Sequence, residues 1–309
     1  MVLLIQKLTK HYFKLENCQH PITHPQPGEL QSSLLDFKSH VSKSIGQLAS
    51  DLKPGSETLS LAWLQRCLGL LHFINEAFSR LVADIDYPMS KWEAGSSEGY
   101  LRYTLSLLEL LNSISSCLSH IGQTRLSLAH GLTLGENSRK HLKAIQFQPG
   151  CFCFSTNFGE DLDEARVFSG KEWIFREALK EVSRIGFWVC GVLLSCFYGD
   201  SKPYMELRKI VGGFDGSLVA ALDFKISDQL VQKMPIFSEI KDVNDVVAVL
   251  LVASDHGATK ELQTKLQALE KLSDDISKEV DNLFANVMTQ RSELVDGFRL
   301  QNHPQKSIV

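Results

Sequence analysis

The sequence predicts an all-α protein: an elongated antiparallel bundle with a long coiled-coil-like C-terminal helix. Two observations predict this fold. Apolar residues recur at spacings of three and four through most of the chain, and short breaks rich in Pro or Gly separate the periodic segments. A chain of 309 residues is long enough to bury a substantial core.

Composition and charge place the chain among ordinary globular proteins. It is 44% hydrophobic and 22% charged, with a formal net charge of -4. It lacks the basic excess typical of nucleic-acid-binding proteins, so we expect no nucleic-acid partner. Seven scattered cysteines, an odd number, and no N-x-S/T sequon favour free thiols in a reducing compartment. We therefore expect an intracellular, cytoplasmic protein, with the cytosolic face of a membrane as the alternative location.

Residues 1–29 are expected to form an N-terminal lead and a Pro-rich linker. The lead, MVLLIQKLTKHYFKLENC, lacks the layout of a secretory signal, because its lysines follow a very short apolar run. Its apolar residues lie opposite the lysines at helical spacing, which suits either a peripheral membrane contact or an ordinary first helix. The following CQHPITHPQPG contains three prolines, and no helix can cross it.

Residues 30–309 are expected to form one helical domain, with helical layers at about 30–146 and 170–298. The first helical pattern ends at Pro54-Gly55 and has one apolar face, made by Leu34, Phe37, Val41, Ile45, Leu48 and Leu52. The second, at residues 60–86, is apolar on more than one stripe, as expected of a helix central to a bundle. The third runs from residue 97 to about 134. These three patterns predict the bundle core.

Between the second and third patterns, the stretch Gly95-Ser96-Ser97-Glu98-Gly99 fits the G-x-S-x-G motif of a serine-hydrolase nucleophile elbow. That motif needs a strand before the serine and a helix after it. No β-patterned run precedes Gly95, so a loop with Ser96 or Ser97 as the helix N-cap is the better interpretation. We assign no catalytic residue.

Three segments carry a resemblance to a known family. They are a Leu-Ser-Leu-x-Trp opening at Leu59 to Trp63, a Pro-containing turn with a nearby Trp at Pro88 to Trp92, and a Leu-Leu-x-Leu-x-Asn-like core at Leu107 to Asn112. From about residue 30 onward the chain resembles the plant BYPASS family. Its turn departs from the acidic turn usual in that family, since Lys91, Gly95 and Ser96 surround Trp92.

The resemblance implies a role in shoot and root development without an established enzymatic activity. Some relatives resemble partners of secretory tethering complexes, which implies a link to trafficking. The resemblance also marks Pro88 and Trp92 as the family's signature turn.

Residues 140–170 lack helical periodicity and are expected to connect two helical layers. Cys151-x-Cys153 within them does not have the spacing of a metal or redox site, and two buried small hydrophobic residues are the better interpretation. His72, His120 and His130 lie on helical patterns without paired spacing. We therefore expect no metal and no cofactor.

The next helical pattern begins after Gly170 and becomes uniformly apolar from Ile185 to Tyr198. At about 1.5 Å per residue this run is roughly 22 Å long. The hydrocarbon core of a bilayer is about 30 Å thick and needs ~20 apolar residues to span it. The shorter length favours a buried core helix. Relatives in the family carry a comparable stretch that has been interpreted as a single membrane span, so that alternative stays open. Glycines 212, 213 and 216 then predict a turn, and a short apolar helix is expected at about 238–253.

The C-terminal segment has the most regular heptad pattern in the chain. Nine successive a and d positions are filled, seven of them by the apolar residues Leu266, Leu269, Ile276, Val280, Leu283, Val287 and Leu294. We predict a coiled-coil-like helix whose seam packs against helices of this chain or against a partner.

Two classes of function remain open from the sequence. The first is a non-enzymatic regulator or adaptor in plant development that presents grooves to a protein partner, which the sequence does not identify. The second is a binder or enzyme of a hydrophobic small metabolite, with a pocket inside the bundle. The sequence leaves the oligomeric state undetermined.

Overall fold

Long helices make up most of the computed structural model, which describes residues 27–52, 59–134, 142–147, 152–154, 170–232, 236–252 and 256–301. In chain order the elements are α2 (Pro27–Ser50), α3 (Leu61–Asp84), the 3-10 helix η1 (Met89–Lys91), α4 (Ala94–Thr133), α5 (Lys171–Tyr198), α6 (Lys202–Ile210), α7 (Ala220–Gln232), α8 (Ser238–Val252) and α9 (His256–Gln301). Within these residues, extended pairing is limited to one isolated bridge between Leu59 and Phe237. The all-α prediction is confirmed. The expected amphipathic N-terminal lead lies outside the described residues.

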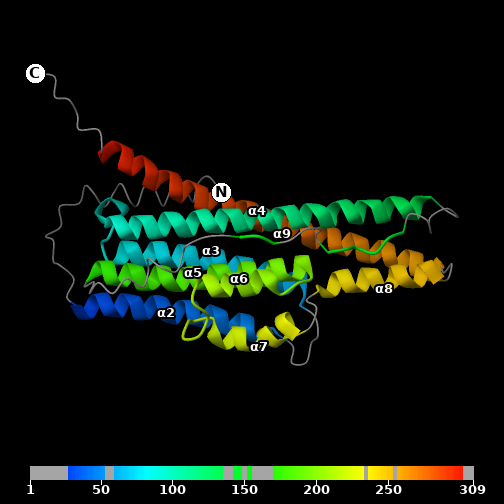
Figure 1. Cartoon of the computed structure of the whole chain (residues 1–309), viewed down its shortest axis with the longest axis horizontal. Coiled ribbons are helices and arrows are strands. Elements are labelled where there is room, and N and C mark those ends of the chain that lie inside the picture. Colours follow the sequence, from blue (N-terminus) through cyan, green and yellow to red (C-terminus); the bar gives the residue numbers. More distant parts are fainter. Residues whose placement is uncertain are drawn as a thin grey trace, which may run out of the picture.

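The helices lie side by side in an elongated bundle (Figure 1). α3 runs opposite to α2, and α4 runs opposite to α3, as the sequence predicted. α2 begins at Pro27, so the helical domain starts three residues before the expected boundary. The helices expected at residues 60–86 and at about 238–253 are present as α3 and α8.

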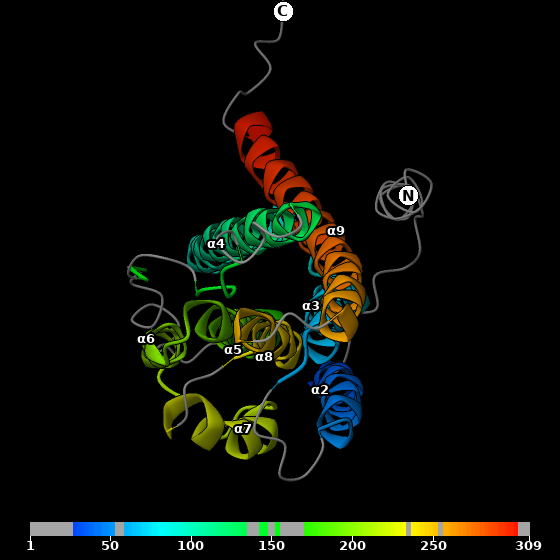
Figure 2. The same cartoon turned by 90° about the vertical axis from the view of Figure 1, so that its right-hand side faces the viewer.

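α5 is the central helix of the bundle. It contacts α2, α3, α4, α6 and α7, and Figure 2 shows these helices arranged around it. Every residue from Ile185 to Phe197 is buried. α5 is long and apolar enough to cross a membrane, but 89% of its most apolar 18-residue window is buried inside the bundle. This burial supports the core-helix interpretation of residues 185–198.

A glycine in α5 allows α6 to approach closely. A Cβ atom added at Gly191 would lie 3.1 Å from the Cα atom of Tyr204 in α6, closer than ordinary van der Waals contact. The backbone amide of Tyr204 also donates to the Ser195 hydroxyl, 3.0 Å away. After α6 the chain turns through Gly212, Gly213 and Gly216, all at positive φ, as the sequence predicted.

α4 and α9, with 40 and 46 residues, form the longest antiparallel pair. Tyr100 donates to Gln290 at one end of the pair (3.0 Å), and Arg125 contacts Glu270 nearer the other end (2.7 Å). At about 1.5 Å per residue these helices are ~60 and ~70 Å long, and they set the length of the molecule.

The heptad seam of α9 faces the bundle. All seven apolar seam residues, Leu266, Leu269, Ile276, Val280, Leu283, Val287 and Leu294, are buried. α9 contacts α3, α4, α8 and η1 of the same chain. In this structure the seam is therefore part of the core. A direct role for it in binding a partner stays a prediction.

This burial predicts the stability of seam variants. Truncating a buried leucine typically costs about 2–5 kcal/mol, so Leu269→Ala combined with Leu283→Ala should unfold the chain or lower its urea midpoint strongly. Leu126→Ala, at a leucine of α4 that is 58% exposed, is the matched control and should change the free energy of unfolding by about 0.5 kcal/mol or less. Urea denaturation followed by circular dichroism measures both. A double variant as stable as the control would show that α9 is not part of the core.

Candidate functional site: the signature turn and the surrounding surface

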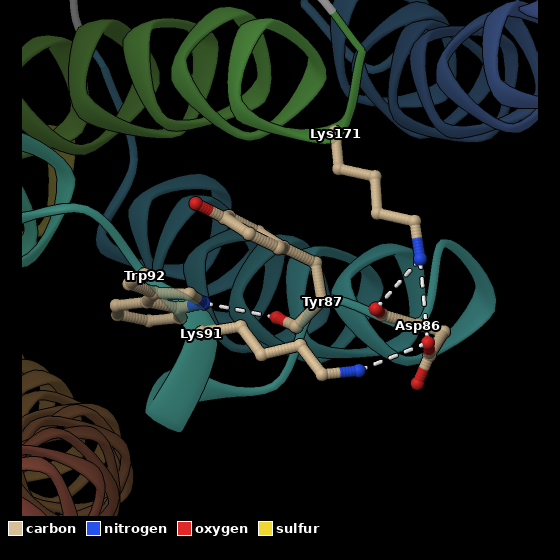
Figure 3. A network of polar contacts seen from close by, with 5 residues as sticks. All are labelled: Asp86, Tyr87, Lys91, Trp92 and Lys171. Atoms are coloured by element: carbon tan, nitrogen blue, oxygen red, sulfur yellow. Dashed lines mark hydrogen bonds and ion pairs between the residues drawn. The ribbon is translucent and has the colours of Figure 1, made fainter.

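The signature turn, Pro88 to Trp92, and the two residues before it connect α3 to α4 through η1 (Figure 3). Asp86 has a positive φ of 47°, which reverses the chain at the end of α3. Its carboxylate accepts from Lys91 (3.1 Å) and Lys171 (3.3 Å), and Lys171 also donates to its carbonyl (2.9 Å). Burial raises the pKa of Asp86, but the two lysines outweigh burial and hold that pKa below its usual value. The turn is thereby tied to the first residue of α5.

The signature residues themselves support packing. Pro88 lies directly before η1. The indole N–H of Trp92 donates to the Tyr87 carbonyl (2.9 Å), and its ring lies 4.4 Å from the ring of Phe175 and 5.2 Å from that of Tyr100. Trp92 is buried. It therefore holds α4 and α5 together at this end of the bundle and offers little surface to a partner.

A buried carboxylate lies beneath this turn. Glu172 of α5 is only 6% exposed, and its oxygens accept hydrogen bonds from the Tyr87 and Ser96 hydroxyls. Arg176, one turn later on α5, pairs with the same carboxylate at 2.7 Å. Since a buried charge is costly unless it is paired and hydrogen-bonded, these donors explain why Glu172 is tolerated here.

The hydrogen bonds and charges around Glu172 keep its carboxylate ionised and the Tyr87 hydroxyl protonated. Burial would raise the pKa of Glu172, but hydrogen bonds from Arg176, Ser96 and Tyr87 together hold it below the usual value. Burial and the nearby carboxylate raise the pKa of Tyr87. Glu172 is thus ionised and Tyr87 protonated near neutral pH, and neither is poised to exchange a proton.

The structure corrects the prediction for residues 95–99. They are not a loop: α4 begins at Ala94, and Glu93 is its N-cap residue, without a side-chain capping bond. Ser96 cannot serve as the cap because its hydroxyl donates to Glu172, 76 residues away in sequence. A helix N-terminus that follows η1 also differs from the strand-to-helix turn of a nucleophile elbow.

Ser97, the serine of the G-x-S-x-G pattern, is a buried helix residue. It is 3% exposed, and its hydroxyl has no hydrogen-bond partner within the described residues. A nucleophilic serine needs a base within hydrogen-bond reach. This environment does not provide the activation that the motif implies.

Two further buried carboxylates hold the opposite side of α5. Asp223 of α7 accepts from the Trp188 indole (2.8 Å) and the Tyr204 hydroxyl (2.6 Å), and Arg208 lies 3.5 Å away. Glu181 accepts from the backbone amide of Leu218 at 2.9 Å. These contacts orient α6, α7 and the preceding turn around α5.

The cysteines and histidines do not assemble into a site within the described residues. No group of three His, Cys, Asp or Glu side chains there could hold a metal ion. Cys67, Cys117, Cys190 and Cys196 are buried free thiols, but Cys153 is exposed, so the prediction that it is a buried hydrophobic residue is wrong. Cys151 lies outside the described residues. His72 contacts Asn286 at 3.2 Å, whereas His120 has a buried Nε2 without a described partner.

Two grooves mark the surface around these elements. One, of about 450 Å³, lies between the first turns of α4 and the C-terminal half of α9. The other, of about 540 Å³, follows α6 and includes Lys202, Met205 and Lys209. Both open to solvent along their length, in contrast to the enclosed clefts that usually hold small molecules.

Comparison with known proteins identifies relatives in plants. "Protein BPS1, chloroplastic" of Arabidopsis thaliana, a BYPASS1-like protein, is 25% identical over 305 residues, covering 87% of this chain and 86% of its own length. The BYPASS-like resemblance is confirmed. No family model matches this chain, and no solved structure matches it.

Rice proteins share a shorter region with this chain. Two proteins named "UPF0496 protein 4", from Oryza sativa subspecies japonica and indica, are each 22% identical over 201 residues. The match covers 58% of this chain and 44% of each rice protein, so the chain spans less than half their length. None of the three names states an enzymatic activity.

Each motif that carries the resemblance to the BYPASS family has a structural role. In the Leu59 to Trp63 opening, the Ser60 hydroxyl caps α3, and the Trp63 indole donates to the Leu48 carbonyl of α2 at 3.1 Å. Within Leu107 to Asn112, the leucines at 107, 108, 110 and 111 are buried. The residues that give the resemblance therefore specify the fold.

No sequence pattern marks the polar residues that connect the helices. Glu172, Asp223 and Arg291 belong to no motif, and each has partners on other elements of the fold: Tyr87 and Ser96 for Glu172, Trp188 for Asp223 and Thr104 for Arg291. In the sequence, the position of Glu172 in its helix does not differ from that of a glutamate on the protein surface. Only the folded structure buries it beneath the Tyr87 and Ser96 hydroxyls, which donate hydrogen bonds to its carboxylate.

The Glu172 cluster predicts a pH-dependent contribution to stability. Glu172→Gln should lower the free energy of unfolding at pH 7 by about 2–4 kcal/mol, because the partly buried Arg176 loses its charged partner. Since the folded-state pKa of Glu172 is lowered, its contribution is present above the ordinary glutamate pKa of about 4.3 and is lost as the pH falls. The difference between wild type and variant should therefore shrink below about pH 4. Urea titrations from pH 7 to pH 3 measure it.

Glu177→Gln is the matched control for that experiment. Glu177 is on the same helix but is only half-buried, and it lies 3.9 Å from Lys38. Such surface pairs contribute about 0–1 kcal/mol. Equal effects of the two variants, or a Glu172→Gln deficit that persists at pH 3, would show that Glu172 is not ionised in the folded state.

Ser97→Ala should leave stability unchanged or slightly increased. The substitution removes a buried hydroxyl that has no described partner, and such a group is costly to bury. Thermal unfolding and complementation of a plant that lacks the gene measure stability and biological activity. A well-folded Ser97→Ala protein without biological activity would restore the active-site hypothesis.

Proposed function

We propose that this chain is a non-enzymatic helical regulator of plant development that acts through contacts with a protein partner. The similarity to BPS1 and the BYPASS resemblance support the developmental part. The contact with a partner, and its link to secretory trafficking, are the finer parts of the proposal.

One observation carries the non-enzymatic part. The three buried carboxylates of the described residues, Glu172, Glu181 and Asp223, each bind a neighbouring element of the same chain. They therefore position helices, and none of them faces an enclosed apolar cavity as a free acid or base would. A metabolite binder would instead need polar groups converging on such a cavity.

The compartment is a second part of the proposal. We place the chain inside the plant cell, in the cytoplasm or at the cytosolic face of a membrane. The relative BPS1 is named chloroplastic, which makes the chloroplast the competing location. A fluorescent fusion of the full chain in leaf cells distinguishes the two by overlap with chlorophyll emission.

Affinity purification of the tagged full chain from plant tissue tests the function. We expect a protein to co-purify in near-stoichiometric amount, because a helical regulator without chemistry of its own must act by binding. Mass spectrometry of proteins and of extracted small molecules provides the measurement. A tagged helical protein of the same compartment is the control. A stoichiometric apolar metabolite without any enriched protein would overturn the proposal in favour of the metabolite-binding alternative.

A further inference from the structure

The groove between α4 and α9 combines exposed apolar side chains with an arginine that has no counter-ion among the described residues. It lies beside the signature turn, and its walls include Leu101, Leu105, Arg102 and Arg291. Leu105 is 46% exposed. Met288 of α9, 41% exposed, lies one turn before Arg291. The antiparallel pair aligns Tyr100 with Gln290 and Leu101 with Arg291. Met288 therefore falls at about the level of Leu105 along the two helices.

Arg291 differs from the other arginines in its electrostatic environment. It donates to the Leu101 carbonyl and to the Thr104 hydroxyl, the latter at 3.1 Å, both through Nη1. Both acceptors are neutral. Of the arginines whose side chains the structure describes, only Arg291 has no carboxylate oxygen within 4.0 Å. Its Nε and Nη2 atoms make no hydrogen bond within these residues, and they form the edge that a carboxylate binds with two parallel bonds.

The other charged side chains of the groove, Glu98 and Arg102, do not neutralise Arg291. Glu98 pairs with Arg102 at 2.8 Å, one turn apart on α4, so the two cancel. Arg291 is then left as the unbalanced charge of the groove wall. A partner that brings a single carboxylate would complement it.

We propose that this groove is the partner-binding surface and receives an amphipathic helix that places an acidic residue within one turn of large apolar residues. The inference rests on the proposed function, since it takes the partner to be a protein. The apolar residues would cover Leu105 and Met288 while the carboxylate pairs with Arg291. An open groove between two helices suits a helix laid along it, because a small molecule would remain largely exposed there.

Selection of a random library of 16-residue peptides on the full-length chain tests the inference. We expect the enriched peptides to carry Asp or Glu within four positions of Leu, Ile, Met or Phe. Their affinity, measured by fluorescence anisotropy, should fall about tenfold or more in Arg291→Gln. Arg291→Lys, which keeps the charge, should recover part of the loss.

Two further variants separate binding from folding. Arg125→Gln removes the other arginine that connects α4 and α9, a residue paired with Glu270 at 2.7 Å, and it should leave peptide affinity within about twofold. Leu105→Glu introduces a negative charge at an exposed position, so it should abolish binding without unfolding the chain. Thermal unfolding checks that each variant is folded.

Three results would overturn the inference: no enriched peptide, enriched peptides without an acidic residue, or unchanged affinity in both Arg291→Gln and Leu105→Glu. These failures are distinguishable from failure of the proposed function. If a partner still co-purifies from plant tissue with Leu105→Glu, the regulator uses another surface and only the groove assignment is wrong. If no protein co-purifies with the wild-type chain, the proposed function itself fails.

Discussion

Burial of α5 is the constraint on which the rest of this structure depends. From Ile185 to Phe197 the helix presents apolar or small side chains in every direction, so it cannot lie on a surface facing water. Surrounding helices must cover it on all sides, and α2, α3, α4, α6 and α7 do so. α9 then closes the outside of the bundle by packing its seam against α3 and α4. The elongated shape follows from the length of these helices.

Apolar burial does not by itself fix how each helix is oriented around α5, since it is non-directional. Polar contacts at the ends and side of α5 orient the neighbouring helices and turns relative to it. Glu172 binds the turn before α4, Glu181 binds the turn before α7, and Trp188 binds Asp223 within α7. Each contact satisfies a buried group that would be costly if left alone. The same contacts engage the buried carboxylates that could otherwise act as a catalytic acid or base.

The relation between resemblance and function follows from this arrangement. The motifs that carry the resemblance to the BYPASS family cap helices, fill the core or brace the turn at Trp92. They describe a scaffold. Features that could distinguish partners lie on its surface, where Leu105 and Arg291 are exposed to a groove. Similarity in the scaffold therefore implies the fold more directly than it implies any binding partner.

The helices could be predicted from sequence alone, because spacings of three and four and the Pro and Gly breaks are local properties of the chain. The sequence also determined that α9 has a buried seam and that residues 185–198 are apolar all round. Tertiary structure decided where α4 starts, because Ser96 gives its hydroxyl to Glu172 instead of capping the helix. Folding likewise leaves Cys153 exposed and places Arg291 against the neutral Leu101 carbonyl and Thr104 hydroxyl, away from every described carboxylate. These outcomes depend on atoms far apart in sequence, which only folding brings together.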